Sequence, residues 1–529
     1  MKLFQALIRY SCVRELRTIA KMAGDRNLTS MRSELKEIFA AGLNSVKPHV
    51  LIKEKVRVQG DELIIDGFGY EMTPKVHLVG CGKAVLGMAL EMEKLLGNRL
   101  MRGIVSLPRG SAALDTANFG KYEISKARGV LSYHENCENN VADVATLEVT
   151  REIISLVQNL DERDTLIVLI SGGSSALLSQ PHPSLTLAEK NAFWKNLQNR
   201  GADIKEVNKV RQKLSMVKGG KFAKLAFPAR VIGLVLSDVI GDPIDLIGSA
   251  PTHFSDTEPE EIREILGKYG FKENEVDRRI WSLLCEQNGG RWDLQDGGSR
   301  ARSQWNRTDF DRYVTNIIIG NNLCAINAAK EQALNGGLKV VVLRNDIEGL
   351  VRNVSRMYIN LAKSVCLLWE KKMARGDFVN EVKSVVGKFE DLDAIVDDVE
   401  RGTEGILMIG GGEPAVIVKG TGKGGRNQEL ALQFSEDWAR EVGREGTLGK
   451  FEVLFLSAGT DGQDGPTDAT GAFGYSEIAQ REPKFVDFLR NNDAYHFYER
   501  FNNGSDLLKT GFTGTNVMDL HFVYLRRRG

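Results

Sequence analysis

The feature that most constrains the fold is a recurring alternation of strand-like apolar runs with helical periodicity. Lys75 to Val79 is such a run; after a glycine turn, apolar residues recur at helical spacing from Ala84 to Leu96. The runs from Thr165 to Ile170 and from Val231 to Ser237 also end in polar turns. Strands that alternate with helices favour α/β layers with largely parallel sheets. Open sheets of this kind bind ligands at the carboxyl ends of their strands.

Composition limits the class of protein. A chain of 529 residues that is 42% hydrophobic is long enough for two or three domains. Its 70 Lys+Arg balance 70 Asp+Glu, so the overall charge predicts neither a nucleic-acid partner nor an anionic membrane surface. The six cysteines show no C-x-x-C pair, which indicates reduced thiols inside the cell. No apolar run approaches the roughly 20 residues of a membrane span.

The N-terminus leaves the location open. Met1 to Arg26 is basic and fits either a mitochondrial address or an ordinary amphipathic first helix. We therefore expect a cytoplasmic protein, with a mitochondrial one as the alternative. Either a monomer or a homodimer is compatible with the sequence.

A polar stretch divides the α/β pattern. Between Phe271 and Asp311 the apolar periodicity is weak, which indicates an insert or linker. The acidic stretch from Phe389 to Glu404 is interpreted as a solvated insertion. The predicted division is 10–265, an insert or linker at 266–311, and a second α/β domain at 312–529. The second domain has expected strands at Tyr313 to Ile319, Val340 to Leu343, Ile406 to Ile409, Ala415 to Val418, near Val453, and Val517 to Leu525, and helices up to Leu334 and from Leu350 to Lys372.

Glycine-rich turns are the candidate ligand sites. Glycines and cations are interspersed over Lys419 to Arg426, where backbone N–H groups and positive charge suit a phosphate. Lys83 follows Gly80-Cys81-Gly82 in the expected first turn of a helix and suggests a balancing anion; the alternative is a surface lysine after a structural turn. The turn Ser171 to Ser175 predicts either a phosphate cradle or a serine-capped helix start. The basic segment from Asn208 to Lys221 is either a phosphate-binding or a solvated face.

Two turns carry aspartates. Asp238 and Asp242 follow a strand and suit magnesium, which needs only one or two protein carboxylates; turn-forming aspartates are the alternative. Asp461 and Asp464 lie on a second such turn and suggest metal or hydroxyl handling. The histidines are isolated, so a hydrolytic triad is not expected.

Together these segments resemble the class II glycerate 2-kinases, whose C-terminal part is the MOFRL domain. The matching segments, in the family's order, are GCGKA at 80–84, SGGSSALL at 171–178, VRQKLSMVKGGKFA at 210–223, LSDVIGDPIDLIGSAPT at 236–252, GGEP at 411–414, GKGGRNQELAL at 422–432, SAGTDGQDGPTDATGA at 457–472 and TGTNVMDL at 513–520. The resemblance implies a Rossmann-like three-layer N-terminal domain, a smaller α/β domain with its MOFRL region at about 403–522, and an active site in the cleft between them.

The resemblance also implies roles for residues. The family's essential lysine falls on Lys83 and its essential arginine on Arg426, and we expect Asp461 to join them in catalysis. Asp238, Asp242 and Asp464 are the expected magnesium residues, although neither carboxylate pair can be ranked as metal or base. The expected nucleotide- and phosphate-binding residues are Gly80, Gly82, Ser171, Gly172, Gly173, Ser174, Ser175, Lys213, Lys221, Asn321, Glu413, Gly422, Gly424 and Gly425.

The implied reaction moves the γ-phosphoryl group of ATP to D-glycerate, with magnesium, and gives 2-phosphoglycerate. Phosphoryl transfer mainly needs positioning and charge neutralisation, which this set of residues can supply. The alternatives are a kinase that forms 3-phosphoglycerate, an oxidoreductase acting on hydroxypyruvate and a non-catalytic nucleotide-binding module. At His134 to Glu138 the chain departs from a His-Pro-containing turn of many members, so the resemblance does not carry a substrate role over to His134.

Overall fold

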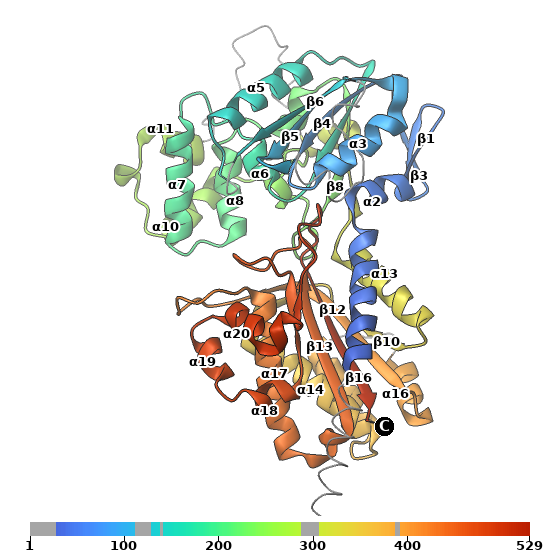
Figure 1. Ribbon diagram of the computed structural model, residues 1–529. Helices are drawn as coiled ribbons and strands as arrows, with labels where there is room; N and C mark the ends of the chain where they lie inside the picture. The colour runs from blue at the N-terminus through green and yellow to red at the C-terminus, as the bar shows by residue number, and fades with distance from the viewer. Residues whose placement is uncertain (1–27, 112–128, 138–140, 287–305, 387–391, 529) are drawn as a thin grey trace, which may run out of the picture. The chain divides into compact units, whose positions relative to one another are not determined.

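The chain forms two compact units, each described here by itself (Figure 1). The computed structural model describes residues 28–111, 129–137, 141–286, 306–386 and 392–528. The parallel-sheet unit comprises Val46–Asn321 and Gly514–Val517, and the mixed-sheet unit comprises the other described residues. The basic segment Met1 to Arg26 lies outside the described residues, so the prediction of a mitochondrial address is not tested.

The parallel-sheet unit contains a sheet of six parallel strands. Their spatial order is β6-β5-β4-β7-β8-β9, so the chain starts in the middle, builds one half and then crosses over to build the other (Figure 1). The strands are β4 (Lys75–Cys81), β5 (Leu100–Pro108), β6 (Leu131–Asn136), β7 (Asp164–Ile170), β8 (Arg230–Leu236) and β9 (Val314–Gly320). The order reverses between β4 and β7, and a reversal of this kind is where doubly wound sheets bind ligands.

The strands of this sheet form because their apolar runs are buried on both faces. Every residue of β7 is buried, as expected for a central parallel strand covered on either side. A separate small antiparallel sheet is formed by β1 (Val56–Gln59), β2 (Glu62–Ile65) and β3 (Phe68–Glu71).

Helices connect and cover the strands. Three of them, α5, α7 and α8, begin with reciprocal capping boxes, Asp143 with Thr146, Thr186 with Glu189 and Asp203 with Glu206, which satisfy the first free N–H groups. The helices are α2 (Pro48–Lys55), α3 (Val85–Leu96), α5 (Val144–Gln158), α6 (Ser174–Leu177), α7 (Leu187–Asn199), α8 (Ile204–Lys213), α9 (Lys221–Leu225), α10 (Pro259–Lys268), α11 (Arg278–Cys285) and α12 (Arg307–Tyr313).

The structure divides the chain differently from the sequence-based division at 265 and 312. The strand expected at Tyr313 to Ile319 pairs with β8 and completes the parallel sheet, rather than starting the second domain. The predicted insert at 266–311 is not a linker throughout, because Leu266, Phe271 and Leu284 are buried in a core with α7 and α8. Apolar residues too sparse for a periodic pattern still pack when partner helices lie beside them. Residues 287–305 lie outside the described part.

The second sheet is mixed. Its strands lie in the order β10-β12-β16-β13-β14-β15, with β11 also paired to β12. Strands β10 and β11 run parallel to β12, whereas β16 runs antiparallel to both β12 and β13. The strands are β10 (Lys339–Val342), β11 (Ile347–Leu350), β12 (Gly405–Ala415), β13 (Phe451–Gly459), β14 (Gly471–Gly474), β15 (Leu507–Leu508) and β16 (Asp519–Arg527).

Two long helices pack on this sheet and carry its aromatic core. Phe434 of α17 stacks on Phe455 of β13 with ring centroids 4.6 Å apart, and Tyr358 of α14 contacts the same ring. Residues 28–45 are also helical and belong to this unit. The other helices are α13 (Asn322–Asn335), α14 (Val351–Trp369), α15 (Arg375–Val386), α16 (Leu392–Arg401), α17 (Arg426–Arg444), α18 (Ser476–Arg481), α19 (Phe485–Arg490) and α20 (Ala494–Arg500).

Two local predictions for this unit are wrong. The segment Ala415 to Val418 is not a second strand: β12 runs through the glycines to Ala415, and the chain then leaves the sheet with Ile417 and Val418 exposed. The acidic stretch at 389–404 is not a solvated insertion in its described part, because it forms α16 with Val396 and Val399 buried. The helical spacing of these two apolar residues, three positions apart, outweighed the local negative charge.

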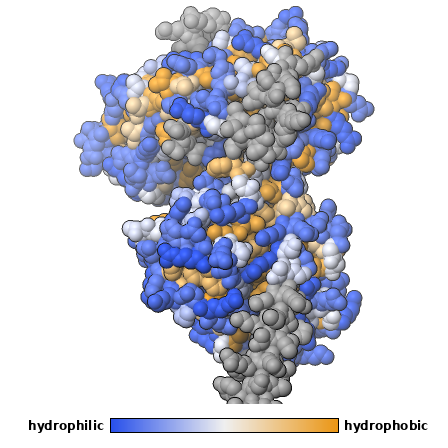
Figure 2. All heavy atoms as spheres, viewed as in Figure 1, coloured by the Kyte–Doolittle hydropathy of each residue, from blue (hydrophilic) through white to orange (hydrophobic). Residues whose placement is uncertain are grey.

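The chain is thus an α/β protein with a parallel six-stranded sheet in its N-terminal unit and a mixed sheet in its C-terminal unit. On the face shown in Figure 2, hydrophilic residues cover most of the coloured surface. None of the described helices combines the length and apolar character that crossing a membrane requires. None of the five cysteines within the described residues takes part in a disulfide with another of them.

Candidate active site

The turns after β4 and β7 bond to each other at the reversal of the strand order. The Lys83 N–H donates to the Gly172 carbonyl (2.9 Å), and the Ala84 N–H donates to Ser171 Oγ (3.0 Å). Gly82 has φ +144°, and a Cβ there would lie 2.2 Å from Ser171 Oγ. Glycine is therefore required both by the backbone conformation and by the approach of the second turn. The glycine turn before Lys83 and the turn Ser171–Ser175, which were predicted as separate motifs, therefore pack together.

Lys83 is an exposed cation on the first of these two turns. Ala84 is the N-cap of α3 and Val85 its first residue, so Lys83 precedes the helix instead of lying in its first turn as predicted. Its side chain is exposed, and within the described residues no carboxylate forms an ion pair with its ammonium group. A lysine in this position is available to a ligand anion.

Asp238 lies directly against the glycine turn. It follows β8, and a Cβ on Gly172 would lie 1.9 Å from its Oδ2, so only glycine leaves room for the carboxylate. The Asn516 amide is 3.4 Å from the same oxygen. Asp242, at φ +54°, instead accepts a hydrogen bond from Asn321 Nδ2 (2.6 Å), which ties together two residues predicted for metal and nucleotide. Asp238 thus lies in direct contact with the turn after β7.

These carboxylates fit magnesium only as a partial ligand set. No cluster of three or more His, Cys, Asp or Glu side chains suited to a metal occurs within the described residues. Mg²⁺ in kinases is typically held by one or two carboxylates together with substrate phosphates and water. The oxygen donors of Asp238 and Asp242 therefore suit an ion that arrives with a nucleotide, rather than a resident structural metal.

The serines of the turn are held in place by their neighbours. Ser175 Oγ lies 3.0 Å from Ser249 Oγ, which in turn donates to Asn208 Oδ1 (2.9 Å). The Ser174 hydroxyl is buried without a hydrogen-bond partner in the described part of the chain. A buried unsatisfied hydroxyl costs free energy, so Ser174 is a group that a ligand could satisfy.

Lys213 and Lys221, both predicted to bind phosphate, lie at the connection between α8 and α9. Lys221 is half-buried, and its Nζ donates to the carbonyls of Gln212 (2.8 Å) and Ser215 (2.8 Å) and lies 3.4 Å from that of Lys213. Burial and nearby lysines lower the pKa of Lys221 to about 7. Burial also lowers the pKa of Lys213. Lys221 therefore holds the connection between α8 and α9, and a phosphate-binding role for either lysine stays a prediction.

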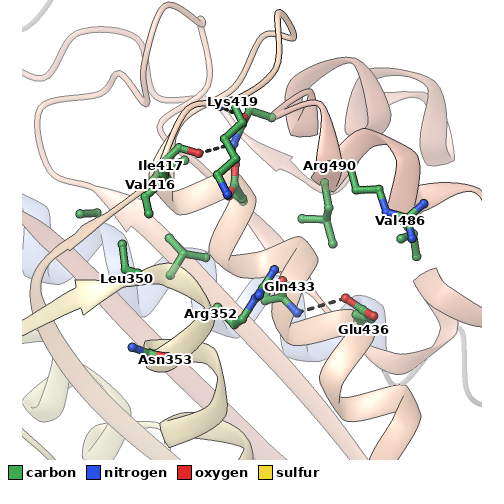
Figure 3. Close-up of a pocket in the computed structure, with 15 residues that line it drawn as sticks. Leu350, Arg352, Asn353, Val416, Ile417, Lys419, Gln433, Glu436, Val486 and Arg490 are labelled. Atoms are coloured by element: carbon green, nitrogen blue, oxygen red, sulfur yellow. Dashed lines mark hydrogen bonds between the residues drawn. The ribbon is translucent and has the colours of Figure 1, made fainter.

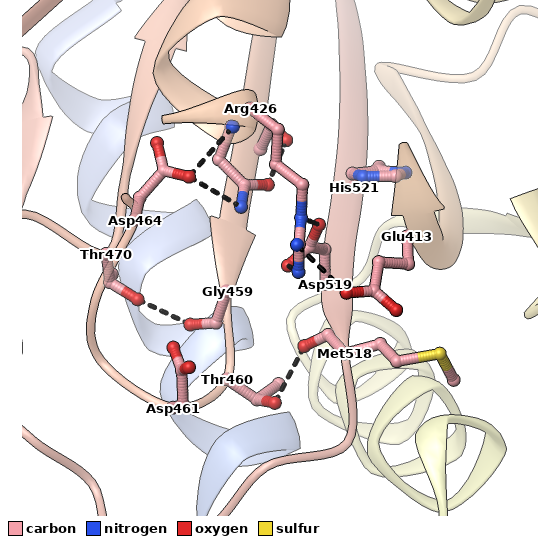
Figure 4. Close-up of polar contacts among 12 residues, drawn as sticks. Glu413, Arg426, Gly459, Thr460, Asp461, Asp464, Thr470, Met518, Asp519 and His521 are labelled. Carbon is pink, nitrogen blue, oxygen red and sulfur yellow. Dashed lines mark hydrogen bonds and ion pairs between the residues drawn. The ribbon is translucent and has the colours of Figure 1, made fainter. Parts of the chain in front are cut away.

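Arg426 is the centre of an ion-pair network in the mixed-sheet unit (Figure 4). It is the first residue of α17, and its Nε and Nη2 donate to the two carboxylate oxygens of Asp519 (2.5 and 3.0 Å). Its Nη1 donates to Glu413 Oε1 (2.9 Å). Asp519 is 1% exposed and Arg426 33% exposed. The guanidinium is thus fixed on one side and accessible on the other.

Electrostatics keep Arg426 charged. Burial disfavours the charge, but Asp519 and Glu413 outweigh it and raise the pKa of Arg426. Burial raises the pKa of Glu413 against the pull of Arg426. The sequence motifs included Asp519 in the TGTNVMDL segment without assigning it a role. Only its pairing across the sheet, where Asp519 lies opposite both Gly412 and Gly459, brings it to the arginine.

The two predicted aspartates of the turn after β13 differ from each other. Asp464 is buried and accepts the N–H groups of Asn427 (3.1 Å) and Gln428 (2.8 Å), so it caps α17. Burial raises its pKa to about 7. Asp461 is half-buried, and a Cβ on Gly459 would lie 3.3 Å from an oxygen of both Asp461 and Asp519. Asp461 therefore lies at the end of β13, beside the Arg426 network. Asp464 instead makes the contacts of a helix cap, and a metal-binding role for Asp464 stays a prediction.

The glycine-rich loop that precedes Arg426 binds protein rather than presenting free amides. The N–H groups of Gly420, Gly422 and Lys423 donate to Asn492 Oδ1 (3.0 Å), the Asn491 carbonyl (3.0 Å) and Asp493 Oδ1 (2.8 Å), respectively. A Cβ on Gly422 would lie 2.3 Å from Asp493 Cβ. The glycines thus permit close packing against residues 491–493. Phosphate binding by Gly422, Gly424 and Gly425 stays a prediction.

A cavity of about 610 Å³ lies beside the other end of this loop (Figure 3). Its lining includes Leu350 and Arg352 at the start of α14, Ile417 and Lys419 of the loop, and Arg490 of α19. No residue of the Arg426 network lines it. The cavity is separate from the predicted catalytic residues.

Comparison with known proteins agrees with this organisation. Residues 34–285 match a family described as a domain of unknown function (DUF4147), and residues 406–519 match the MOFRL family. The chain is 35% identical to the glycerate kinase of Danio rerio over 510 residues, covering 94% of this chain and 98% of the relative. It is 31% identical to the D-glycerate 2-kinase of Thermotoga maritima, covering 93% and 97%.

A solved structure extends the likeness to the fold. The crystal structure of the glycerate kinase from Thermotoga maritima superposes with a TM-score of 0.70 at 28% identity, covering 94% of this chain and 99% of that one. The human glycerate kinase is 35% identical over 525 residues, with 97% and 96% coverage. Family models, near full-length relatives and a solved fold agree, and this chain, which matches both the DUF4147 and the MOFRL models, therefore belongs to the glycerate kinase family.

Proposed function

We propose that this protein is an ATP-dependent kinase that phosphorylates the 2-hydroxyl of D-glycerate. One observation carries the proposal: the turns that hold Lys83 and Ser171–Ser175 bond to each other where the parallel strand order reverses. The strand order is that of Rossmann-like nucleotide-binding sheets, and we therefore propose that the parallel-sheet unit is a Rossmann-like domain. The names of the relatives supply the substrate class.

The O2 atom of glycerate forms a bond to the γ-phosphorus, the bond from that phosphorus to the β–γ bridging oxygen breaks, and ADP leaves. The hydroxyl proton passes to the carboxylate of Asp461. Lys83 and Arg426 stabilise the negative charge that spreads over the transferring group and the substrate carboxylate. Both units therefore contribute residues to catalysis, and the location of the shared site stays a prediction.

The Arg426 network suits this role chemically. A guanidinium held by Asp519 and Glu413 cannot rotate freely, so its remaining N–H groups are oriented before the substrate arrives. Asp238 and Asp242 would hold the magnesium ion that accompanies ATP, which neutralises phosphate charge when bound. Whether the protein is a monomer or a homodimer, and cytoplasmic or mitochondrial, stays open to measurement.

The test is to incubate the protein with Mg-ATP and D-glycerate and to identify the product by phosphorus NMR. A coupled assay with enolase, which accepts 2-phosphoglycerate, reads the same reaction. Enolase-competent product supports the proposal, whereas 3-phosphoglycerate keeps a kinase but moves the hydroxyl. ATP binding without glycerate-dependent ADP would favour a binding module, and turnover of reduced nicotinamide with hydroxypyruvate would favour an oxidoreductase.

A further inference from the structure

A second basic site lies in the parallel-sheet unit, beside the Ser171–Ser175 turn. It is a cavity of about 200 Å³ lined by that turn and by helices α7 and α8. Its polar lining includes Ser175, Ser179, Lys190, Asn191, Arg211 and Lys218. The described lining contains no Asp or Glu. We call this cavity, with Lys190, Arg211 and Lys218, the cation pocket.

Two of its lysines are almost completely buried. Lys190 is 3% exposed and Lys218 2% exposed. Lys218 Nζ donates to the carbonyls of Ser175 (2.9 Å), Leu178 (3.2 Å) and Gly248 (3.3 Å), which uses all three of its N–H groups. Lys218 therefore holds the turn in place and contributes positive charge, but it has no hydrogen bond left for a ligand.

Lys190 and Arg211 keep donors that the protein does not use. Lys190 Nζ donates to Ser179 Oγ (3.0 Å), which leaves two of its N–H groups. The Arg211 guanidinium stacks on the Trp194 ring at 3.9 Å, and within the described residues it forms no hydrogen bond or ion pair. A stacked guanidinium has a fixed plane, and its fork of N–H groups matches the oxygens of a phosphate.

The charge in the pocket is not compensated by the described protein. Burial and the charge of Arg211 lower the pKa of Lys190 to about 8, and burial lowers the pKa of Arg211 to about 10. Burial, Lys190 and Arg211 all lower the pKa of Lys218. Burying charges without a counter-charge is unfavourable. Three gathered cations therefore indicate an anionic ligand that carries several negative charges.

Size and position narrow the ligand. A cavity of about 200 Å³ is smaller than the roughly 300–1,000 Å³ that enclose a whole drug-sized molecule, so it suits a charged part of a ligand. It lies against Gly173 and Ser175, in the turn at the reversal of the sheet. A singly charged carboxylate would leave most of the positive charge unbalanced, whereas a phosphate chain would balance it.

We propose that the cation pocket binds the phosphate chain of the nucleotide, with Lys190 and Arg211 as its direct donors. The inference rests on the proposed kinase function for the identity of the nucleotide. It replaces Lys221, whose ammonium is used on backbone carbonyls, as the main phosphate-binding cation of this region.

The test compares Arg211→Met and Lys190→Met with the control Lys205→Met, which removes an exposed lysine of the same helix as Arg211 outside the pocket. Dissociation constants for tripolyphosphate, Mg-ADP and D-glycerate are measured by calorimetry on the full chain. We expect Arg211→Met to weaken tripolyphosphate and Mg-ADP binding by about 10- to 100-fold, as for the loss of one charge-assisted forked contact, with glycerate binding unchanged. Lys205→Met should bind like the original protein.

Other outcomes have definite meanings. Unchanged polyphosphate affinity in both pocket variants would overturn the proposal, and so would a selective loss of glycerate binding, which would make the pocket the substrate carboxylate site. If Arg211→Met does not fold, Arg211→Lys keeps the charge, removes the fork and should bind polyphosphate at least several-fold more weakly. If the pocket variants lose polyphosphate binding but the original protein shows no kinase activity, the proposal for the pocket stands and the proposed kinase function is wrong. If the original protein is a kinase and Arg211→Met keeps its KM for ATP, the kinase function stands and the proposal for the pocket is wrong.

Discussion

Arg426 and Arg211 are both arginines near the end of a helix, but opposite kinds of charge surround them. Arg426 is the first residue of α17, where the helix dipole disfavours a cation, and two carboxylates compensate it. Arg211 lies in the last turn of α8, where the dipole favours a cation, and it shares a pocket with two lysines. The paired arginine is oriented by the protein alone. The unpaired one is completed by a ligand.

This contrast separates stability from function in the two units. Removing a charge from a paired network leaves its partner buried and uncompensated, so both the fold and the reaction should be affected. Removing a charge from a pocket of like charges relieves repulsion, so the fold should tolerate it while binding weakens. The four predictions below test this difference, beginning with the largest effect.

Arg426→Ala should affect both rate and stability. Loss of one preorganised charge contact typically lowers kcat by about 10²–10³-fold. The buried Asp519 carboxylate would also lose its partner, which should lower the free energy of unfolding by about 3 kcal/mol. Steady-state kinetics and urea unfolding measure the two effects. The double variant Arg426→Met/Asp519→Asn should recover most of the stability and none of the activity; a stable Arg426→Ala single variant would contradict the pairing argument.

Lys83→Met should lower kcat by a similar factor of about 10²–10³ but leave the melting temperature nearly unchanged, because the side chain is exposed and no carboxylate of the described residues pairs with it. The same kinetics together with thermal unfolding check this split. Lys94→Met on α3 is the matched control, since it removes an exposed lysine whose ammonium pairs with Glu91 on the surface. Near-normal turnover in Lys83→Met would remove this residue from the catalytic set.

Asp464 should make stability depend on pH. Its pKa is raised by burial to about 7 in the folded protein, against about 3.9 when unfolded. Between these two pKa values the folded state binds more protons than the unfolded state. The contribution of Asp464 to the free energy of unfolding is therefore lost as pH rises from about 4 to 7. The free energy of unfolding of Asp464→Asn minus that of the original protein should therefore rise between pH 5 and 8, by up to a few kcal/mol.

The control for that slope is Asp468→Asn on the same turn. Its carboxylate pairs with Lys509 and Tyr495, which lower its pKa, so its contribution is lost only as pH falls towards that lowered value. Asp468→Asn should therefore show no such slope between pH 5 and 8. Equal slopes for the two variants would indicate that Asp464 does not carry the titration.

Lys190→Met should have the smallest effect, and in the opposite direction. Replacing a buried, uncompensated ammonium by an apolar side chain of similar length should raise the free energy of unfolding by about 1 kcal/mol without ligand. Urea unfolding measures it, with the exposed Lys195→Met on the same helix expected within about 0.5 kcal/mol of the original protein. A marked loss of stability would mean that the hydrogen bond from Lys190 to Ser179 outweighs the repulsion among the cations, and that Lys190 is a structural residue and not a ligand donor.

Local patterns predicted most of the elements. The run from Lys75 to Val79, the glycine turn and the periodic helix that follows appear as β4 and α3, because period and turn chemistry act over a few residues. The helices α13 and α14 and the last strand β16 were likewise predictable. The strand β9 was predicted as an element but placed in the wrong domain, since its partner β8 is separated from it by several helices.

Partners distant in sequence account for the missed parts of the candidate site. Asp519 meets Arg426 only through the pairing of β16 with β12 and β13. The amides of Gly420, Gly422 and Lys423 in the glycine-rich loop are satisfied by residues 491–493, some 70 positions away. Lys190 had no local motif at all, and it joins Arg211 and Lys218 only because α7, α8 and the turn after β7 line one cavity.

The sequence by itself determined the α/β class, the glycine turns and the chemical types available for phosphoryl transfer, because strand period, helix period and backbone freedom are properties of neighbouring residues. The tertiary structure alone decided which cations are neutralised by the protein and which face a cavity without a counter-charge. That distinction depends on Coulomb interactions and burial over a few ångströms in space, and contacts between side chains far apart along the chain set both.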